Sequence, residues 1–569
     1  MPRVVVVDRD LCNFKKCQYP CMKVCPKNRS GEKCISIGAD KFPEVDEDIC
    51  IGCGLCVKKC DFAALNVINL PEALKENPMI QFGPNSFRLF RLPIPSGGVV
   101  GLLGENGTGK TTALRILSGS VKPNLGMFGQ DVDWKDIIRA YRGNEIQHYM
   151  EKLSVGGMRT VYKPQQVDLL TKRFKSLDEL AIREDFFARL GIDREKRELA
   201  KLSGGELQKI SIAHTLSEDA DIYYLDEPSN FLDVRERLRV AKFIRELSAN
   251  RSMMIVEHDL ATLDFMADSI HVFYGKPGSF GVVSKPYAVK NGINSFLSGF
   301  IKEDNVRISE PITFESSFMQ KKCNDPLLAF GDIKKQLGNF MLEVSSGHIF
   351  RNETMGVFGS NALGKTTFAK ILAGVIESDA DIDRKIRISY KPQYLSAIEF
   401  SGIVYEMLSS IKDPSDQEFR AIIRRTDVER LLMKTVSRLS GGELQRVATA
   451  ACLGRDADLY LLDEPTAYLD VGQRMALAKY LKNSDRTFLV IDHDIMFLSY
   501  VSDRCMLFSG KSGSHGTAKM HSLKEGLNVF LKDLDITFRR DEETKRLKAN
   551  KPGSVKDREQ KERGEYFEL

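Results

Sequence analysis

A set of short motifs occurs twice in this chain, in the same order, with the two copies about 240 residues apart. Each copy has a glycine-rich loop ending in Gly-Lys-Thr-Thr, the heptapeptide LSGGELQ, an apolar strand running into Asp-Glu-Pro, and an apolar strand followed by His-Asp. The serine of LSGGELQ and the aspartate of Asp-Glu-Pro are 23 residues apart in both copies. A fixed period of this kind marks a duplicated structural unit. The sequence therefore predicts two domains of one α/β fold.

The glycine-rich loops, GENGTGKTT (104–112) and GSNALGKTT (359–367), match the pattern of a phosphate-binding loop. Glycines let backbone N–H groups approach phosphates, the lysine reaches the β and γ oxygens, and the threonine after it can hold Mg²⁺. A helical pattern follows each loop, which places the phosphates at a helix N-terminus. The ATP-binding candidates here are Gly104, Asn106, Gly107, Gly109, Lys110, Thr111 and Thr112, and Gly359, Asn361, Gly364, Lys365, Thr366 and Thr367.

The residues for hydrolysis also come in pairs. Phosphoryl transfer to water depends mostly on positioning and charge neutralisation. We expect the strand-end aspartates to hold Mg²⁺, the next glutamates to polarise the attacking water, the histidines to contact the γ-phosphate, and the glutamines of a repeated YKPQ to sense Mg²⁺ and nucleotide. These residues are Asp226 and Asp463, Glu227 and Glu464, His258 and His493, and Gln165 and Gln393. Singly, each would suit a capped turn or a surface polar group; in this order in both halves they favour catalysis.

This motif order closely resembles that of the ATP-binding cassette ATPases. The resemblance implies that LSGGELQ acts in trans, with Ser203, Gly204 and Gly205 closing on nucleotide at the second loop and Ser440, Gly441 and Gly442 closing at the first. Asp233 and Asp470, in the FLD and YLD that follow, are further ATP-binding candidates, and Phe87 is placed to stack on adenine. ATP would then join the two halves and hydrolysis would release them, a ligand-driven domain closure.

Nine of the twelve cysteines lie in the first 60 residues. Cys50-x2-Cys53-x2-Cys56-x3-Cys60 has the spacing of the bacterial ferredoxin run, whose fourth cysteine ligates the other cluster. The run Cys12-x4-Cys17-x3-Cys21-x3-Cys25-Pro is the expected partner, although it is wider than the bacterial spacing and Asp61 stands where proline usually follows the second run. We expect one [4Fe–4S] cluster on Cys12, Cys17, Cys21 and Cys60 and another on Cys25, Cys50, Cys53 and Cys56, with Cys34 left over.

The alternatives to iron–sulfur clusters are structural zinc and disulfides. Zinc sites usually pair two Cys-x2-Cys units across a longer loop, which suits these runs less well. The start of the chain has no apolar segment of the kind that directs secretion, so we expect a reducing compartment, where clustered cysteines favour metal over disulfides.

The two halves differ in ways that predict unequal ATP sites. The glycine-rich loop and YKPQ glutamine are 61 residues apart in the first half and 34 in the second. The excess includes residues 134–153, whose pattern predicts two short helices broken at 142–144. This insertion is either a packed decoration or a docking device, and we favour docking. Ala362 stands where the first loop has Gly107, and Asp492 precedes His493 where Glu257 precedes His258.

We predict an α/β chain with two head-to-tail cassette domains behind a small ferredoxin-like two-[4Fe–4S] domain. The expected boundaries are 1–75 for the iron–sulfur domain, 76–290 for the first cassette (insertion about 134–155), 291–310 for a hinge, 311–525 for the second cassette, and 526–569 for a second hinge and tail. The charged tail after 540 is expected to be less ordered. A net charge of +5 is too small to indicate nucleic acid by itself, and no apolar run is long enough to span a bilayer.

The cysteine runs in front of twin cassettes, with NLP, PNSF, RLPIP, VEHDL, YGKPGS and LDITFRRD, resemble the subfamily-E cassette ATPases, the RNase L inhibitor or Rli family. The resemblance implies a Mg-dependent ATPase that splits ribosomes after termination or stalling. Its implied partners are the small subunit, a class-one release factor or Pelota-type factor, and initiation factors, with no membrane. The expected location is the cytoplasm, with the nucleus a further option. Two rivals stay open: a transporter ATPase with fused cassettes, and a redox protein with ATP-gated electron transfer.

Overall fold

The computed structural model describes residues 3–9, 11–69, 77–314, 325–377, 382, 386–393 and 400–568. The chain forms two compact units. The first comprises Met1–Asn230, Lys242–His258 and Met266–Pro311, and the second comprises Phe231–Ala241, Asp259–Phe265 and Ile312–Leu569. Within the described ranges, no helix is long and apolar enough to cross a membrane. Residues 70–76, at the expected boundary between the iron–sulfur domain and the first cassette, lie outside those ranges.

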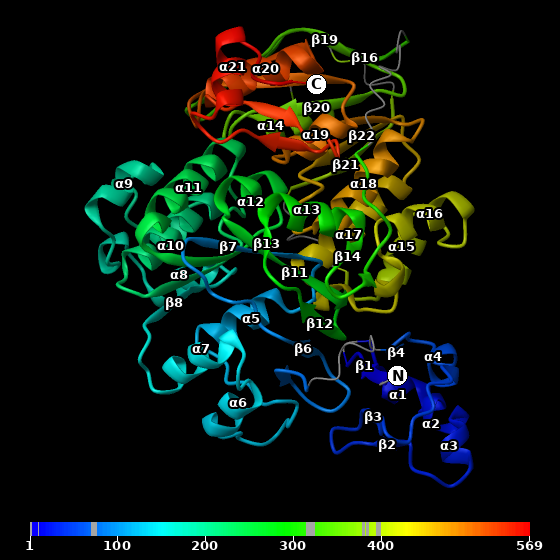
Figure 1. Cartoon of the computed structure of the whole chain (residues 1–569). Helices are drawn as coiled ribbons and strands as arrows, with labels where there is room; N and C mark the ends of the chain where they lie inside the picture. The colour runs from blue at the N-terminus through cyan, green and yellow to red at the C-terminus, as the bar shows by residue number, and fades with distance from the viewer. Residues whose placement is uncertain are drawn as a thin grey trace. The chain divides into compact units, whose positions relative to one another are not determined.

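The cysteine-rich segment is a small domain of two antiparallel strand pairs and four short helices (Figure 1). Strand β1 (Arg3–Val7) pairs with β4 (Leu65–Asn69), so the two ends of the segment lie together, and β2 (Ile35–Ile37) pairs with β3 (Pro43–Val45). The helices are α1 (Phe14–Cys17), α2 (Pro20–Val24), α3 (Pro26–Arg29) and α4 (Leu55–Lys58). Buried Val5, Val7, Ile35 and Leu65 pack with the cysteines to form its core.

The first cassette is built on a sheet of nine strands. Five neighbours run parallel in the order β11 (Ser269–Lys276), β7 (Val99–Gly104), β10 (Ser252–Val256), β9 (Ile222–Asp226) and β8 (Thr160–Lys163). β7, β9 and β10 are almost entirely apolar, as expected for parallel strands that are covered on both faces. The sheet continues from β11 with β12 (Phe280–Val283), β6 (Arg88–Phe90) and β5 (Ile80–Gln81), and β13 (Tyr287–Ala288) pairs with β11.

The second cassette repeats the main path of this sheet. Its order is β17 (Ile333–Leu337), β18 (Phe340–Val344), β25 (His515–Ser522), β24 (Arg504–Lys511), β20 (Thr354–Phe358), β23 (Thr487–Ile491), β22 (Leu459–Asp463) and β21 (Ile388–Lys391). A separate pair joins β16 (Pro326–Phe330) to β19 (Gly347–Phe350). The loop-bearing strand, β7 or β20, occupies the same place in both sheets, so the predicted duplication is confirmed.

Corresponding helices also occur in the two cassettes. The glycine-rich loops lead into α5 (Lys110–Leu117) and α14 (Lys365–Leu372), and LSGGELQ begins α10 (Gly204–Ser217) and α17 (Gly441–Gly454). The remaining helices of the first half are α8 (Asp168–Arg173), η1 (Leu177–Glu179), α9 (Glu184–Leu190), η2 (Leu199–Lys201), α11 (Val234–Leu247), η3 (Ser248–Asn250) and α12 (Leu260–Met266). Those of the second half are α15 (Val404–Ser409), α16 (Gln417–Arg425), η4 (Glu429–Leu431), η5 (Val436–Arg438), α18 (Val471–Lys482) and α19 (Ile495–Val501).

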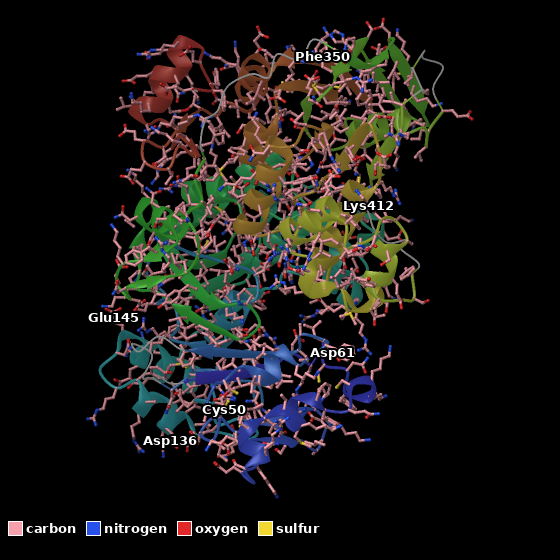
Figure 2. The ribbon with its side chains drawn as sticks, turned by 90° about the vertical axis from the view of Figure 1, so that its right-hand side faces the viewer. Cys50, Asp61, Asp136, Glu145, Phe350 and Lys412 are labelled. Atoms are coloured by element: carbon pink, nitrogen blue, oxygen red, sulfur yellow. The ribbon has the colours of Figure 1, made fainter. Side chains whose placement is uncertain are left out.

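The insertion forms two helices, α6 (Trp134–Ala140) and α7 (Glu145–Ser154), as the sequence predicts. Asp133 caps α6 by accepting a hydrogen bond from the backbone N–H of Lys135. Figure 2 labels Asp136 and Glu145, one on each helix. Buried Ile146, Tyr149 and Met150 join the core of the first cassette, so the hairpin is fixed to the domain that carries it.

The pattern Gly-hydrophobe-Asn-x-Phe-Leu occurs twice in the sequence, at 292–297 and 526–531, and lies on two equivalent helices, α13 (Val289–Ser298) and α20 (Leu523–Leu534). The glycine of each helix lets the helix pack closely on its sheet. A Cβ added at Gly292 would lie 3.3 Å from the Cβ of Ile270, and one added at Gly526 would lie 2.2 Å from the Sγ of Cys505. β14 (Phe300–Ile301) and β15 (Val306–Arg307) pair after α13.

The expectation of a less ordered tail after residue 540 is wrong. Strands β26 (Phe538–Arg540) and β27 (Leu547–Ala549) pair, and α21 (Val555–Arg563) follows them. The order depends on buried polar contacts: Thr537 Oγ1 donates to Asp557 Oδ1 at 2.7 Å, and Asn550 Nδ2 donates to Thr537 Oγ1 at 2.9 Å. Such contacts are invisible in a charged, apolar-poor sequence.

Candidate ATP sites and cysteine chambers

The predicted catalytic residues of the first half meet at one edge of its sheet. Strands β8, β9, β10 and β7 are parallel neighbours, so their carboxyl ends, which carry YKPQ, Asp-Glu-Pro, His258 and the glycine-rich loop, lie side by side. Ligands bind at this edge of open α/β sheets. The loop glycine Gly109 has a φ of 95° and precedes α5, whose first residue is Lys110.

Glu227 is the centre of the first site. It is buried, and its carboxylate accepts a hydrogen bond from Gln165 Nε2 at 2.8 Å and lies 3.4 Å from His258 Nε2. Asn230 also donates to it. Although burial alone would raise its pKa, the contacts with His258 and the charge of Lys110 hold the pKa of Glu227 at about 2. The glutamate is therefore ionised at neutral pH, as a group that polarises water must be.

The neighbouring aspartate fits a cation. Asp226 Oδ2 accepts hydrogen bonds from Thr111 Oγ1 at 2.8 Å and from the Tyr162 hydroxyl at 3.1 Å, whereas its Oδ1 is buried with no hydrogen-bond partner among the described residues. Burial and the adjacent Glu227 raise the pKa of Asp226. An orphaned carboxylate oxygen beside a threonine hydroxyl is the donor set that Mg²⁺ takes in phosphate-binding loops.

The second site repeats this geometry. Glu464 accepts a hydrogen bond from Gln393 Nε2 at 2.6 Å and lies 3.3 Å from His493 Nε2, and despite its burial these contacts hold its pKa at about 2. The Asp463 carboxylate is buried, and burial raises its pKa to about 6. Thr366 holds the position on α14 that Thr111 holds on α5. The same groups for a cation are therefore present in both halves.

The loop lysines are folded onto their own loops. Lys110 Nζ donates to the carbonyl oxygens of Gly104 and Glu105, both at 2.7 Å. Lys365 Nζ donates to those of Gly359 at 2.7 Å and Ser360 at 2.8 Å. Each ammonium group therefore lies inside the curve of its loop, where a β or γ phosphate oxygen would replace a carbonyl.

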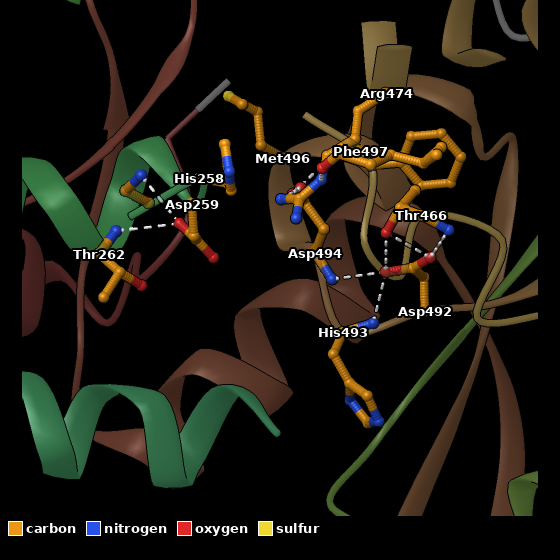
Figure 3. A network of polar contacts seen from close by, with 12 residues as sticks. His258, Asp259, Thr262, Thr466, Arg474, Asp492, His493, Asp494, Met496 and Phe497 are labelled. Carbon is orange, nitrogen blue, oxygen red and sulfur yellow. Dashed lines mark hydrogen bonds and ion pairs between the residues drawn. The ribbon is translucent and has the colours of Figure 1, made fainter. Parts of the chain in front are cut away.

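The two halves differ in the polar contacts near their histidines, and Figure 3 shows the network of the second half. Thr466 Oγ1 donates to the Asp492 carboxylate at 2.8 Å, and the same carboxylate accepts the backbone N–H groups of His493 at 2.7 Å and Asp494 at 2.9 Å. In the first half the residue equivalent to Thr466 is Ser229 by its place after Asp-Glu-Pro, and the next residue, Asn230, donates to Glu227 itself. Asn230 in the first half and Thr466 with Asp492 in the second therefore make different polar contacts near the two glutamates.

The LSGGELQ residues begin two helices. Ser203 caps α10 in a capping box with Glu206, and Ser440 caps α17 with Glu443, so Gly204, Gly205, Gly441 and Gly442 lie in the first turns. These N-termini leave backbone N–H groups available to phosphate. In the second unit, Asp233 accepts the backbone N–H of Asn361 at 2.8 Å, and Asp470 caps α18.

Sequence reasoning found Phe87 but missed its counterpart. An added Cβ on Gly109 would lie 2.8 Å from the Phe87 ring, and one on Gly364 would lie 3.2 Å from the Phe340 ring. Both phenylalanines therefore lie beside a glycine-rich loop, where adenine binding is expected. Strands β6 and β18 occupy equivalent places in the two sheets, and aligning the two halves on these strands would have identified Phe340 as the counterpart of Phe87.

The cysteine runs form two chambers of thiols. Four residues influence one another in the first chamber, where burial and then Cys17, Cys60 and Cys21 raise the pKa of Cys12 to about 12. The second chamber is a cavity lined by Cys25, Cys34, Cys50, Cys53 and Cys56. The described part of the chain holds these cysteines as free thiols, not disulfides. Figure 2 labels Cys50 on this domain.

These chambers fit iron–sulfur clusters. Thiols that raise one another's pKa stay neutral unless a positive centre stabilises the thiolates, and cluster iron supplies that charge. In the second chamber, burial and then Cys50 raise the pKa of Cys56 to about 11. The assignment of Cys12, Cys17, Cys21 and Cys60 to one cluster and of Cys25, Cys50, Cys53 and Cys56 to the other stays a prediction, and Cys34 lines the second chamber as a ninth thiol.

The cysteine domain is fastened to the first cassette by polar contacts within the first unit. Arg88 donates to both oxygens of Glu47, each at 2.9 Å. Asn85, from the PNSF motif, accepts the backbone N–H of Val45 at 2.7 Å and donates to its carbonyl at 2.9 Å. Paired, bidentate contacts of this kind fix orientation as well as position.

The two sheets, each with a phosphate-binding loop and an ionised glutamate, define an ATPase with two cassettes. The cysteine domain in front of them defines an iron–sulfur domain. The family model described as ABC transporter matches residues 88–230 and 342–467, and that described as 4Fe-4S binding domain matches 42–65. An uncharacterized ABC transporter ATP-binding protein of Methanocaldococcus jannaschii is 45% identical over 99% of this chain and 97% of its own length. The translation initiation factor RLI1 of Saccharomyces cerevisiae is 38% identical over 100% of this chain and 98% of its own length.

A solved structure titled as a model of ribosome-bound archaeal Pelota and ABCE1 contains a chain with a TM-score of 0.93 and 45% identity, covering 100% of this chain and 99% of that one. This chain belongs to the subfamily-E ATP-binding cassette ATPases, the RNase L inhibitor family. It is an ATPase whose cofactors are Mg²⁺ and iron–sulfur clusters.

Proposed function

We propose that this chain is a ribosome recycling factor, which splits ribosomes into subunits after termination or stalling and associates with the small subunit during initiation. One observation carries the proposal: the chain matches, end to end, the ABCE1 chain of a structure titled as ribosome-bound with Pelota. A second structure, titled as a complex of the ribosomal stalk protein aP1 with the recycling factor aABCE1, has a TM-score of 0.82 and 45% identity over 87% of this chain.

The proposed partners are the small subunit, with its RNA and proteins, a Pelota-type or class-one release factor, and initiation factors. The proposed location is the cytoplasm, where translation takes place, with a further nuclear presence. The insertion of α6 and α7 is the proposed contact with the small subunit, since these helices have no counterpart among the described residues of the second cassette.

The ATP sites supply the proposed motion. Lys110 and Lys365 would exchange loop carbonyls for phosphate oxygens, and bound Mg²⁺ would neutralise charge beside Asp226 and Asp463. Glu227 and Glu464, ionised and fixed by glutamine and histidine, would take a proton from the attacking water. The serines and glycines of LSGGELQ are proposed to bind nucleotide from the opposite cassette, so that ATP closes the cassettes and hydrolysis reopens them.

The cysteine domain is the proposed moving part. Its clusters would cross-link both cysteine runs and make a small domain stiff. Its contacts with the first cassette, through Glu47, Asn85 and Arg88, would transmit movement of that cassette to the partner factor.

The test is sedimentation of anaerobically purified protein with ribosomes, in ATP or a non-hydrolysable analogue, with and without a Pelota-type factor. We expect binding to the small subunit in the analogue, and conversion of whole ribosomes to subunits in ATP with the factor. Failure to bind the small subunit under every condition would overturn the proposal. Co-purification of a membrane subunit would favour the transporter, and cluster reduction coupled to turnover would favour the redox protein.

A further inference from the structure

A buried lysine stands at the same place in both halves, with no role in the hydrolysis described above. Lys163 and Lys391 are the second residues of the two YKPQ segments and end strands β8 and β21. Their exposed fractions are 0% and 1%. Burying an ammonium group is unfavourable unless its donors are used. A buried lysine at the same position in both halves therefore indicates a functional role.

Both lysines hold the backbone where Asp-Glu-Pro begins. Lys163 Nζ donates to the carbonyl oxygen of Asp226 at 3.2 Å. Lys391 Nζ donates to the carbonyl oxygen of Asp463 at 2.8 Å and lies 3.3 Å from those of Glu464 and Pro392. The shared acceptor belongs to the peptide group that joins the aspartate to the glutamate. The lysine therefore fixes the peptide plane immediately before each glutamate.

The backbone at each of these glutamates is strained, so the peptide group before it needs contacts that fix its orientation. Glu227 has a φ of 47° and Glu464 a φ of 48°, in the left-handed region that residues with a Cβ enter at a cost. Strained backbone persists only where surrounding contacts determine it. The other side of the peptide is also anchored, because the N–H of Glu227 donates to Val256 O at 3.0 Å and that of Glu464 to Ile491 O at 2.8 Å.

We infer that Lys163 and Lys391 are positioning residues for ATP hydrolysis, which hold the Asp-Glu peptide so that the glutamate carboxylate stays directed at its glutamine and histidine. Each lysine acts through the glutamate and not on the nucleotide. The inference rests on the ATPase activity of the family and is independent of ribosome splitting. Its failure would leave the recycling proposal untouched.

The test replaces the lysines by methionine, which keeps the buried stem and removes the donor. Lys163→Met is measured in a Glu464→Gln background, and Lys391→Met in a Glu227→Gln background, so that each site is followed alone. The control is Ser389→Ala on β21, which loses a buried hydrogen bond of 2.9 Å to Cys452 O. The readouts are kcat and KM for ATP without ribosomes, and Tm.

We expect each methionine variant to lower kcat at least tenfold with KM changed less than twofold, at a Tm close to that of the Ser389→Ala control. Lys163→Gln and Lys391→Gln, which keep an N–H donor, should recover part of kcat. Unchanged kcat, or a loss of kcat that the control shares at equal Tm, would overturn the inference. Should Lys391→Met fail to fold because three carbonyl groups lose their donor, Lys163→Met carries the same test through the Asp226 carbonyl.

Discussion

The hydroxyl of Tyr149 is hydrogen-bonded to the hydroxyl of Tyr224 at 2.5 Å, and donates to the carbonyl of Leu117 at 2.5 Å. Tyr149 lies on α7 of the insertion, Tyr224 lies on β9 two residues before Asp226, and Leu117 ends the helix after the phosphate-binding loop. The inserted hairpin is therefore coupled directly to two elements of the ATP site. A surface that binds a partner through α6 and α7 would be mechanically continuous with that site.

Tyr149→Phe tests this coupling. The variant removes both hydrogen bonds and leaves the Leu117 carbonyl and the Tyr224 hydroxyl without these partners, so the free energy of unfolding should fall by about 1–3 kcal/mol. Small-subunit binding should weaken while ATP affinity stays close to normal. Chemical denaturation and sedimentation with ribosomes measure the two effects. His148→Ala, on the exposed side of the same helix, should change neither stability nor binding; equal effects of the two variants would contradict the prediction.

The two ATP sites should turn over at different rates. Glu227 accepts a hydrogen bond from Asn230, whereas at the second site Thr466 bonds Asp492 instead of Glu464. The pKa of both glutamates is held at about 2, so the difference lies in the contacts that orient each carboxylate. Because general-base catalysis depends on that orientation, we expect Glu227→Gln and Glu464→Gln to remove different fractions of the total turnover. Measured single-variant rates that match would refute the asymmetry.

The contact of Glu47 with Arg88 should govern how firmly the cysteine domain is held. Glu47→Gln removes the charge from a bidentate, partly buried pair worth about 1–3 kcal/mol. Hydrogen exchange at the amide of Val45, which donates to Asn85, should quicken about tenfold. Cluster absorbance should not change. Arg9→Ala breaks an exposed ion pair with Asp40 and serves as the control, since exposed pairs contribute little; faster exchange in it as well would argue against a specific anchor.

The C-terminal segment should be a stability element of the second unit. Arg546 is completely buried and pairs with Asp264 at 3.1 Å, with Lys548 on the other oxygen at 3.1 Å. Asp264→Asn removes the carboxylate and leaves Arg546 as an uncompensated buried charge, at a cost of about 3–5 kcal/mol. Arg546→Met together with Asp264→Asn should recover much of that loss. Calorimetry measures the free energy of unfolding of the single and double variants. Additive losses of that free energy would show that the two residues are not coupled.

The sequence was sufficient for the residues that carry chemistry in fixed motifs. Glu227, Gln165 and His258 are predictable from sequence because phosphoryl transfer restricts residue type, and the repeat supplies an independent second copy. The chain's fold class follows from the same motifs. The helices of the insertion follow from apolar spacing around a glycine break.

What sequence reasoning missed depends on contacts between polar residues distant in the chain. Lys163 looks like a solvated lysine in YKPQ, and only the strand register puts it beside the end of β9. The tail after 540 looks disordered because its order comes from Thr537, Asp557 and a buried arginine. Periodicity detects burial of apolar groups and cannot detect burial of paired polar ones.

One consequence of the cysteine chambers concerns the order in which the chain is made. The first chamber needs Cys12 and Cys60, and the second joins Cys25 to the run that begins at Cys50. Neither chamber can therefore be completed by the amino-terminal run alone as it emerges during synthesis. Both need residues that follow the β2–β3 hairpin, so we expect cluster iron to be captured only after the second cysteine run has been made. Loss of either run would open both chambers at once.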